Sequence, residues 1–281
     1  MPPYKVHKVE PPEHTFLPFF AYGVFKPNQI AYPRIGKYVD YFKKVTCPYE
    51  LRERNGMPVL TENRLHGRET SGHILKFNPR YEEKAYKIIS KTKAKKLYEW
   101  TVLRIDNQNV NVLVGKEPEK TNIFMFDELD FDFRRDPIFY DAIEFIERNL
   151  HRYFDNEKER YFNLQMCYML LWASIERFTT FKYGNNTKRY NNEQFSKERA
   201  FKEGIWDVDD SYTVLNSEDL KEYRIIPDEP KKSIRYYYAI RCNVIHTGKS
   251  HIREMEFLEK ATEELLEIYK NVLDDSFRDY D

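Results

Sequence analysis

Apolar residues recur every three or four positions in the second half of the chain, which is the pattern of amphipathic helices. Between positions 160 and 183 the recurring residues are Leu164, Cys167, Tyr168, Leu171, Ile175 and Phe178. Between positions 253 and 274 they are Met255, Leu258, Thr262, Leu265, Tyr269 and Val272. The first set predicts a helix with one buried face. The second set is nearly heptad and suits packing within the chain or between two copies of it.

Two more helices are predicted in the same half. One spans 138–154 and begins beside Pro137, a residue that is favoured at helix starts. The other spans 233–247. The stretch 185–230 is polar and irregular, and its pattern favours only a short helix near 193–203. A loop of this length in a compact domain is usually functional or mobile.

The first half of the chain has shorter apolar runs that favour strands. Its proline-rich start, 1–16, is predicted to be an extended arm because proline excludes helix there. The run FLPFFAYGVF at 16–25 predicts a strand that leads into a turn at Gly23. Stretches 102–105 and 110–114 are predicted to pair as strands joined by the loop 106–109. The chain is therefore predicted to be α+β.

Composition narrows the class of protein. A chain of 281 residues with 22 Tyr, 20 Phe and one third charged residues is typical of a folded, soluble protein. No apolar run approaches the ~18 residues that a membrane span needs, and the N-terminus lacks the apolar core of a signal peptide. Cys47, Cys167 and Cys242 have no metal-ligand spacing, so we expect reduced thiols, with Cys167 in the core. These features predict a cytoplasmic location, no membrane contact, and neither a metal nor a cofactor.

Positive charge is concentrated in one stretch of this neutral chain. Positions 231–253 hold six Lys or Arg residues, two His and no acidic residue. Such a run is a local field that a polyanion would feel. The cationic residues other than Arg241 are predicted to contact RNA, and they are Lys231, Lys232, Arg235, Lys249 and Arg253.

Within that stretch Arg241 and His246 are separated by four residues. Histidine exchanges protons near neutral pH, and arginine presents a planar fork that suits phosphate oxygens. Together they provide what RNA cleavage without a metal needs, with Asn243 as an auxiliary polar group. On an ideal helix Arg241 and His246 lie ~140° apart, so a site would form most simply in a groove against another helix. A solvated Arg and His near a helix end are the alternative reading.

The sequence YYYAIRCNVIHTGKS around Arg241 resembles the Arg-x4–6-His motif of HEPN-domain proteins, and LLWASIERF at 170–178 resembles their second helix. Many members have a polar residue directly after the Arg, where this chain has Cys242. The resemblance spans about 138–273 and implies a helical bundle, homodimerisation and, in many members, ribonuclease activity. Glu176, the acidic residue of the second helix, is an auxiliary candidate that either orients Arg241 or His246 or forms a surface ion pair.

A second resemblance covers about 17–120. The sequences AYGVFKPNQ, YELRERNGMPVL, SGHILKF and LYEWTVLRI come in the order found in γ-glutamylcyclotransferase-like (AIG2-like) domains. The resemblance implies a small β-barrel with flanking helices and a ligand pocket at Tyr22, Gly23, Val24 and Phe25. The implied domains are an arm (1–16), a cyclotransferase-like domain (17–120), a connector (121–136) and a HEPN-like helical domain (137–281).

The proton-shuttling Glu of that family aligns with about Lys93, in the cluster Lys91–Lys96. A lysine is normally protonated and is a poor base unless it is strongly buried. We therefore expect no cyclotransferase activity and a degenerate pocket. The cluster itself is predicted either to bind phosphate or to be a solvated loop.

These features predict an endoribonuclease acting as a homodimer through its helical domain. The resemblances are consistent with a toxin of stress or phage defence, regulated by its N-terminal domain. RNA is the expected partner, and an antitoxin or a small-molecule ligand at the N-terminal domain are further candidates. A non-catalytic RNA-binding or ligand-sensing module and a γ-glutamylcyclotransferase are the alternative functions.

Overall fold

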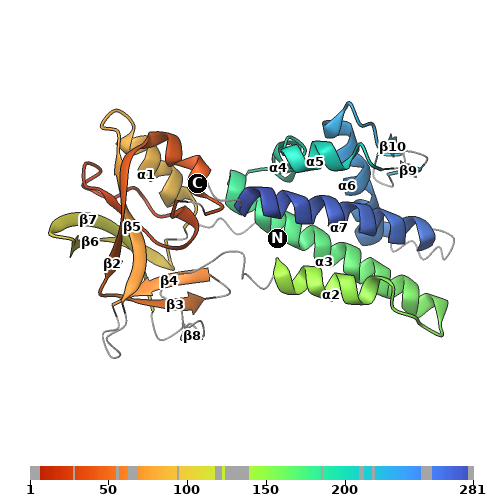
Figure 1. Ribbon diagram of the computed structural model, residues 1–281, viewed down its shortest axis with the longest axis horizontal. Coiled ribbons are helices and arrows are strands. Elements are labelled where there is room, and N and C mark those ends of the chain that lie inside the picture. Colours follow the sequence, from red (N-terminus) through yellow and green to blue (C-terminus); the bar gives the residue numbers. More distant parts are fainter. Residues whose placement is uncertain are drawn as a thin grey trace. The chain divides into compact units, whose positions relative to one another are not determined.

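The computed structural model describes residues 7–27, 29–54, 57–62, 69–93, 95–117, 122–123, 139–184, 186–208, 212–216, 219–247 and 255–277. The chain divides into two compact units, Met1–Phe133 and Arg134–Asp281. The first unit is rich in strands and the second in helices (Figure 1), so the α+β prediction is confirmed. The division falls within the predicted connector 121–136, almost all of which lies outside the described residues.

Two β-sheets form the first unit. The larger sheet has the strand order β2-β5-β1-β7-β6 and the smaller has the order β4-β3-β8. Their bounds are β1 (Phe19–Ala21), β2 (Val39–Cys47), β3 (Glu50–Arg54), β4 (Met57–Thr61), β5 (Thr70–Phe77), β6 (Tyr98–Ile105), β7 (Gln108–Gly115) and β8 (Asn122–Ile123). Among the strands that the structure describes, only β1 and β7 pair in parallel. Helix α1 (Glu82–Lys91) and 3-10 turns at Gly23–Phe25, Tyr32–Arg34 and Gly36–Tyr38 complete the described elements.

The larger sheet is open. Among the described strands β2 pairs only with β5 and β6 only with β7, so the ladders do not close into the predicted barrel. A closed barrel would need hydrogen bonds between these two edge strands. The smaller sheet instead lies close to β7 at Gly115, where an added Cβ would clash with buried Val59. Glycine at this position allows the close approach.

The predicted pair of strands at 102–105 and 110–114 is confirmed, but the turn is shorter than expected. Ile105 lies opposite Gln108, so Asp106 and Asn107 alone form the turn, with φ of 50° and 61°. Asp and Asn tolerate this left-handed conformation, which suits the two-residue turns of hairpins. Gln108 and Asn109, predicted as loop, belong to β7.

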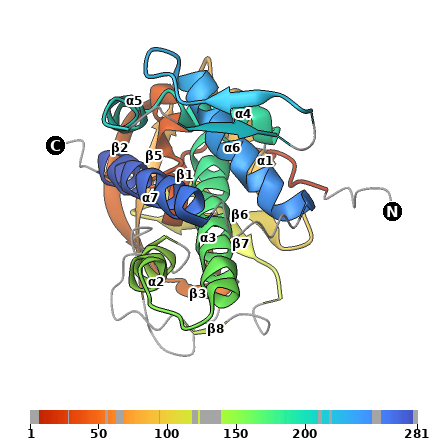
Figure 2. The same cartoon turned by 90° about the vertical axis from the view of Figure 1, so that its right-hand side faces the viewer.

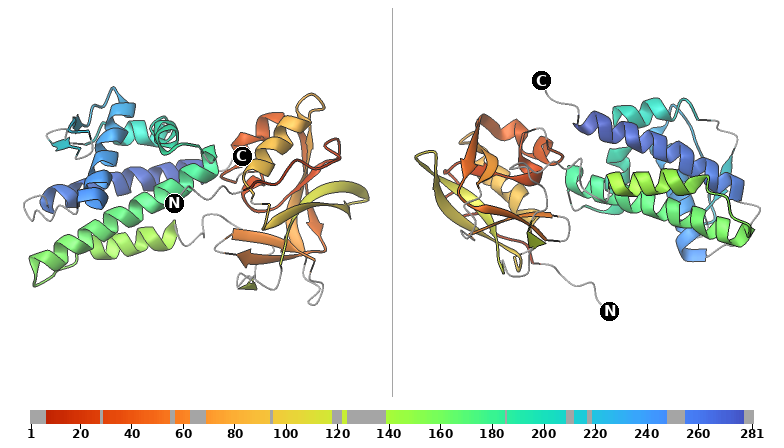
Figure 3. Two further views of the ribbon diagram at one scale, coloured as in Figure 1. Left: turned by 180° about the vertical axis from the view of Figure 1, so that it is seen from behind. Right: turned by 60° about the horizontal axis from the view of Figure 1, so that its bottom comes forward.

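Six helices and one short hairpin make up the described part of the second unit (Figures 2 and 3). Helices α2, α3 and α7 lie side by side, and α6 packs against α3, α4 and the β9–β10 hairpin. Their bounds are α2 (Tyr140–Leu150), α3 (Glu157–Tyr183), α4 (Lys188–Phe195), α5 (Arg199–Gly204), β9 (Thr213–Leu215), β10 (Glu222–Arg224), α6 (Pro230–Thr247) and α7 (Met255–Phe277). No helix in the described ranges is both long enough and apolar enough to cross a membrane.

The apolar positions that predicted the two longest helices are buried, as expected. All six predicted positions in α3 and all six in α7 have 8% exposure or less. The boundaries differ by a few residues: Asn156 caps α3 by accepting from the backbone N–H of Lys158, which starts the helix earlier than predicted. Gly184, with a φ of 101°, follows its last turn.

The stretch 185–230 holds more structure than predicted. In place of one short helix near 193–203 it forms α4 and α5, and the β9–β10 hairpin was not predicted at all. Each strand of that hairpin is three residues long and partly polar, so it has no alternating pattern that a sequence reading detects.

Candidate active site

Helix α6 positions Arg241. Pro230 opens the helix, which suits proline because its missing N–H has no partner in the first turn. Ile240 and Cys242, on either side of Arg241, are buried at 3% and 1% exposure. The side chain of Arg241 is itself only 13% exposed. Because the adjacent residues are anchored in the core, the direction of the Arg241 side chain is well defined.

The guanidinium of Arg241 is held by two partners. Its Nη2 lies 3.5 Å from Oε1 of Glu176 on α3, and its central carbon lies 5.7 Å from the centroid of the Tyr238 ring. Glu176 also accepts a hydrogen bond from Nζ of Lys188 at 3.0 Å. One carboxylate therefore holds two cations, which leaves a surplus of positive charge beside Arg241.

One donor of Arg241 is left without an acceptor. Its Nε is buried and makes no hydrogen bond in the described part of the chain. A buried donor in this state costs about 1–3 kcal/mol. Such groups are rare in native structures and each needs an explanation, of which a functional role is one.

Asn243 contacts a different element from Arg241. Its Nδ2 donates to the backbone oxygen of Leu215 in β9 at 2.9 Å. The bond ties the end of α6 to the hairpin that the sequence did not predict. The structure therefore places Arg241 against α3 and Asn243 against β9.

The other half of the predicted pair is only partly described. The backbone of α6 runs through His246, but the side chain of His246 lies outside the described residues. Lys249 and Arg253, both predicted to contact RNA, also lie outside them.

The three described cations of the predicted RNA-binding stretch each meet a carboxylate. Lys231 and Arg235 lie 3.9 Å and 3.7 Å from Glu193 of α4, and Lys232 lies 2.8 Å from Glu229. These carboxylates come from outside the stretch 231–253, which has no acidic residue of its own. They make its positive field weaker than the sequence alone indicated. The three cationic side chains are 44–57% exposed, and ion pairs at such exposure contribute little stability.

The predicted pocket loop of the first unit is buried. Tyr22, Val24 and Phe25 are 7%, 5% and 2% exposed, and the phenol of Tyr22 donates to the backbone oxygen of Leu113. Burial raises the pKa of Tyr22 far above its usual range. Gly23 has a φ of 65°, and Pro58 occupies the space where a side chain would lie. Both features explain glycine at this position.

Lys93 is the one described lysine of the Lys91–Lys96 cluster that is turned inward. It is 8% exposed, and its Nζ lies 4.6 Å from the centroid of the Tyr98 ring. Lys91, Lys95 and Lys96 are exposed, as a solvated loop requires. Among the described residues Lys93 has no carboxylate partner and no side-chain hydrogen bond.

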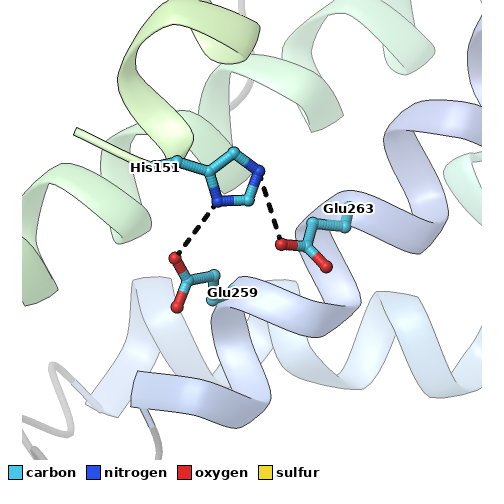
Figure 4. Close-up of side chains that lie close together, drawn as sticks. All are labelled: His151, Glu259 and Glu263. Carbon is cyan, nitrogen blue, oxygen red and sulfur yellow. Dashed lines mark ion pairs between the residues drawn. The ribbon is translucent and has the colours of Figure 1, made fainter.

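A separate cluster could present ligands to a metal ion. His151, Glu259 and Glu263 each offer one ligand atom, and these atoms lie within 4.8 Å of one another. In Figure 4 the two ring nitrogens of His151 face different carboxylates, at 3.6 Å each. Glu259 is also paired with Arg160 at 2.6 Å. The cluster joins the end of α2 to α7 through side chains that are 15–67% exposed.

All three cysteines are buried free thiols, and Cys167 is fully buried as predicted. Burial raises the pKa of both Cys47 and Cys167 to about 11. A thiol with so high a pKa stays protonated at neutral pH and is a poor nucleophile.

Sequence reasoning missed three residues around Arg241 and its helix. Tyr238 carried a signal, because it lies three positions before Arg241 and so shares its face of the helix. Lys188 and Glu193 had no signal in the sequence, because their positions depend on how α4 packs against α3 and α6.

Comparisons of the chain with protein-family models, with curated proteins and with solved structures find no match.

Proposed function

We propose that the protein is a metal-independent endoribonuclease of the HEPN type that works as a homodimer through its helical domain. The observation that supports this most strongly is the state of Arg241. Its guanidinium is held by Glu176 and Tyr238 and retains a buried donor that has no acceptor among the described residues. An oriented arginine beside surplus positive charge is suited to a phosphate whose negative charge grows during cleavage.

In the proposed reaction the 2′-hydroxyl of the substrate attacks its neighbouring phosphorus. His246 removes the proton from that hydroxyl, and Arg241 stabilises the charge that develops on the phosphate oxygens. The P–O5′ bond then breaks, and protonated His246 acts as the general acid that gives a proton to the leaving oxygen. Glu176 orients Arg241, and Asn243 is an auxiliary polar residue. Each subunit of the homodimer brings one Arg241 and one His246 to a shared cleft.

The N-terminal domain is proposed to be a degenerate γ-glutamylcyclotransferase-like domain that regulates the nuclease in a toxin of stress or phage defence. A lysine at position 93, in place of the glutamate of the family, supports the loss of cyclotransferase chemistry, because the family reaction uses a carboxylate as the base there. This domain is the proposed site for a small-molecule ligand or an antitoxin. Release of 5-oxoproline from a γ-glutamyl substrate would contradict this part of the proposal.

Cleavage of mixed cellular RNA in the presence of EDTA tests the proposal. We expect Arg241→Ala and His246→Ala each to lower the cleavage rate at least about 100-fold while leaving the far-UV circular dichroism unchanged. Arg160→Ala is the matched control, because Arg160 is also paired with a glutamate of a neighbouring helix but lies away from Arg241.

Equal cleavage by the wild type and both variants would identify a contaminating nuclease and contradict the proposal. Retention of RNA without cleavage by the wild type would replace it with a non-catalytic RNA-binding module.

A further inference from the structure

A cavity of about 400 Å³ lies in the helical unit between α4, the β9–β10 hairpin and α6. Its size is within the range of about 300–1,000 Å³ that small-molecule sites occupy. Tyr238 belongs to its lining and also lies under the guanidinium of Arg241. The cavity therefore adjoins the proposed cleavage residue without containing it.

The buried residues of the lining combine polar and apolar character. Asn192 of α4 is 9% exposed, Asn216 is 8% exposed, and Ile234 of α6 is 1% exposed. The carboxamide of Asn192 makes no hydrogen bond in the described part of the chain. A carboxamide that is nine-tenths buried and lines a cavity without a partner is suited to a ligand that has both donors and acceptors.

Two tyrosines provide the aromatic part of the lining. Tyr223 of β10 and Tyr238 of α6 are both half-buried. The hydroxyl of Tyr223 donates to Asp219 at 2.8 Å, and this hydrogen bond lowers the pKa of that carboxyl. The bond also fixes the tyrosine ring. Aromatic faces of this kind stack on unpaired nucleobases, with about 1–3 kcal/mol per base.

The exposed residues of the lining are mainly cations. Arg189 and Lys221 have side chains that are 80% and 72% exposed, and Arg235 is 44% exposed. Glu193 lies within 4 Å of Arg189, Arg235 and Lys231, so three cations share one carboxylate. Asp219 also belongs to the lining and lies 3.9 Å from Lys221, so the lining carries three cations and two carboxylates, a balance that favours an anion.

We propose that this cavity binds one unpaired nucleotide, with the base among Asn192, Tyr223 and Tyr238 and the phosphate beside Arg189 and Arg235. A flat heteroaromatic base matches the tyrosines and the buried carboxamide, and a phosphate matches the exposed cations. The nucleotide is either free in solution or one residue of a single-stranded RNA. Binding in the cavity needs neither Arg241 nor His246, so it is a property separate from cleavage.

The test uses the full chain carrying His246→Ala, so that RNA stays uncut. Binding of each of the four 5′-mononucleotides is measured by calorimetry, and binding of a fluorescein-labelled 12-nucleotide single-stranded RNA is measured by anisotropy. Asn192→Leu keeps the approximate volume and removes the carboxamide, and it is expected to weaken binding about tenfold. Arg189→Ala, a change at an exposed residue, is expected to weaken binding about fivefold and to reduce its salt dependence.

Arg148→Ala is the matched control, since Arg148 forms a similar exposed i,i+4 pair with Glu144 on α2 and is expected to leave binding unchanged. If the mononucleotides bind, the cavity is assigned to a free nucleotide. If the RNA binds and the mononucleotides do not, the cavity is assigned to an RNA chain. No binding of either probe, or equal binding by the wild-type cavity and both cavity variants, would overturn the proposal. If the cavity variants weaken binding but the wild type does not cleave RNA, the proposed nuclease activity is contradicted and nucleotide binding in the cavity is supported.

Discussion

Each unit of the protein holds a nearly buried cation on a tyrosine ring, and the two cations differ in what else surrounds them. Lys93 lies 4.6 Å from the ring of Tyr98, and Arg241 lies 5.7 Å from the ring of Tyr238. Arg241 also has Glu176 at 3.5 Å, whereas Lys93 has no carboxylate partner among the described residues. The carboxylate orients the Arg241 side chain, whereas within the described ranges the charged group of Lys93 is placed only against the Tyr98 ring.

The difference shows why similar burial supports different chemistry. A planar guanidinium that is held on one edge by a carboxylate keeps other donors available for a phosphate. An ammonium on a flexible stem is a point charge that presents no fixed donor pattern. Reaction chemistry is therefore expected in the helical unit and not at position 93.

The largest effect in this comparison is expected from removing the negative charge of Glu176, which orients Arg241. Glu176→Gln keeps the shape of the side chain but loses the ion pairs with Arg241 and Lys188. We expect RNA cleavage to fall about tenfold, because Arg241 loses its orientation but is still present. The rate constant is measured under single-turnover conditions, with Glu259→Gln, which breaks the pair with Arg160, as the control. Faster cleavage would contradict the orienting role and show that Glu176 competes with the phosphate.

Removing the other cation tests the same comparison through stability. Lys93→Met keeps an unbranched stem on Tyr98 and removes a buried charge that has no carboxylate partner among the described residues. We expect a gain of about 1 kcal/mol, seen as a rise of a few degrees in the thermal unfolding of the N-terminal unit. Lys91→Met, at an exposed position of the same segment, should leave the unfolding temperature unchanged. A lower unfolding temperature for Lys93→Met would show that the ammonium has a stabilising partner.

A smaller effect is expected from His73, a half-buried histidine of the N-terminal unit. Burial, aided by Lys26 and Lys44, lowers the pKa of His73 from 6.5 to about 4. Between pH 6.5 and about 4 the unfolded chain therefore binds a proton at His73 that the folded chain does not. The contribution of His73 to the free energy of unfolding is complete above pH 6.5 and is lost as the pH falls toward 4. We expect a loss of less than ~1 kcal/mol, because the ring is only half-buried.

Hydrogen exchange of the amides in β1 and β5 measures this loss, since His73 lies opposite Ala21 and Lys44 in the sheet. His73→Gln should remove the part of the pH dependence between 6.5 and 4. An unchanged pH dependence in that variant would assign it to other groups.

The parts of the molecule that depend on one local pattern were predictable. The buried stripes of α3 and α7 follow from helical spacing, and the place of the β6–β7 turn, though not its length, follows from the polar residues 106–109. The closed barrel was not supported, because edge pairing between β2 and β6 depends on the course of strands far apart in the sequence. The burial of the Lys93 side chain could not be predicted either, because the sequence does not show which lysine of the cluster points toward the core.

In the candidate site too, features that follow from a local pattern were predictable, and contacts between distant residues were not. The position of Arg241 on a helix could be predicted, and Tyr238 could have been found from its spacing on that helix. Its pairing with Glu176 joins residues on two helices that are distant in the chain, so the sequence offered two roles for that carboxylate. Neither the cavity nor the hairpin that ties down Asn243 left a readable signal, because both depend on the packing of 185–230.

The chemical ends of the RNA fragments made in EDTA test the central claim most directly. If Arg241 and His246 drive attack by the 2′-hydroxyl, one fragment carries a 2′,3′-cyclic phosphate and the other a 5′-hydroxyl, which mass spectrometry distinguishes. Fragments that end in a 3′-hydroxyl and a 5′-phosphate would show that water is the nucleophile and would contradict the proposed mechanism.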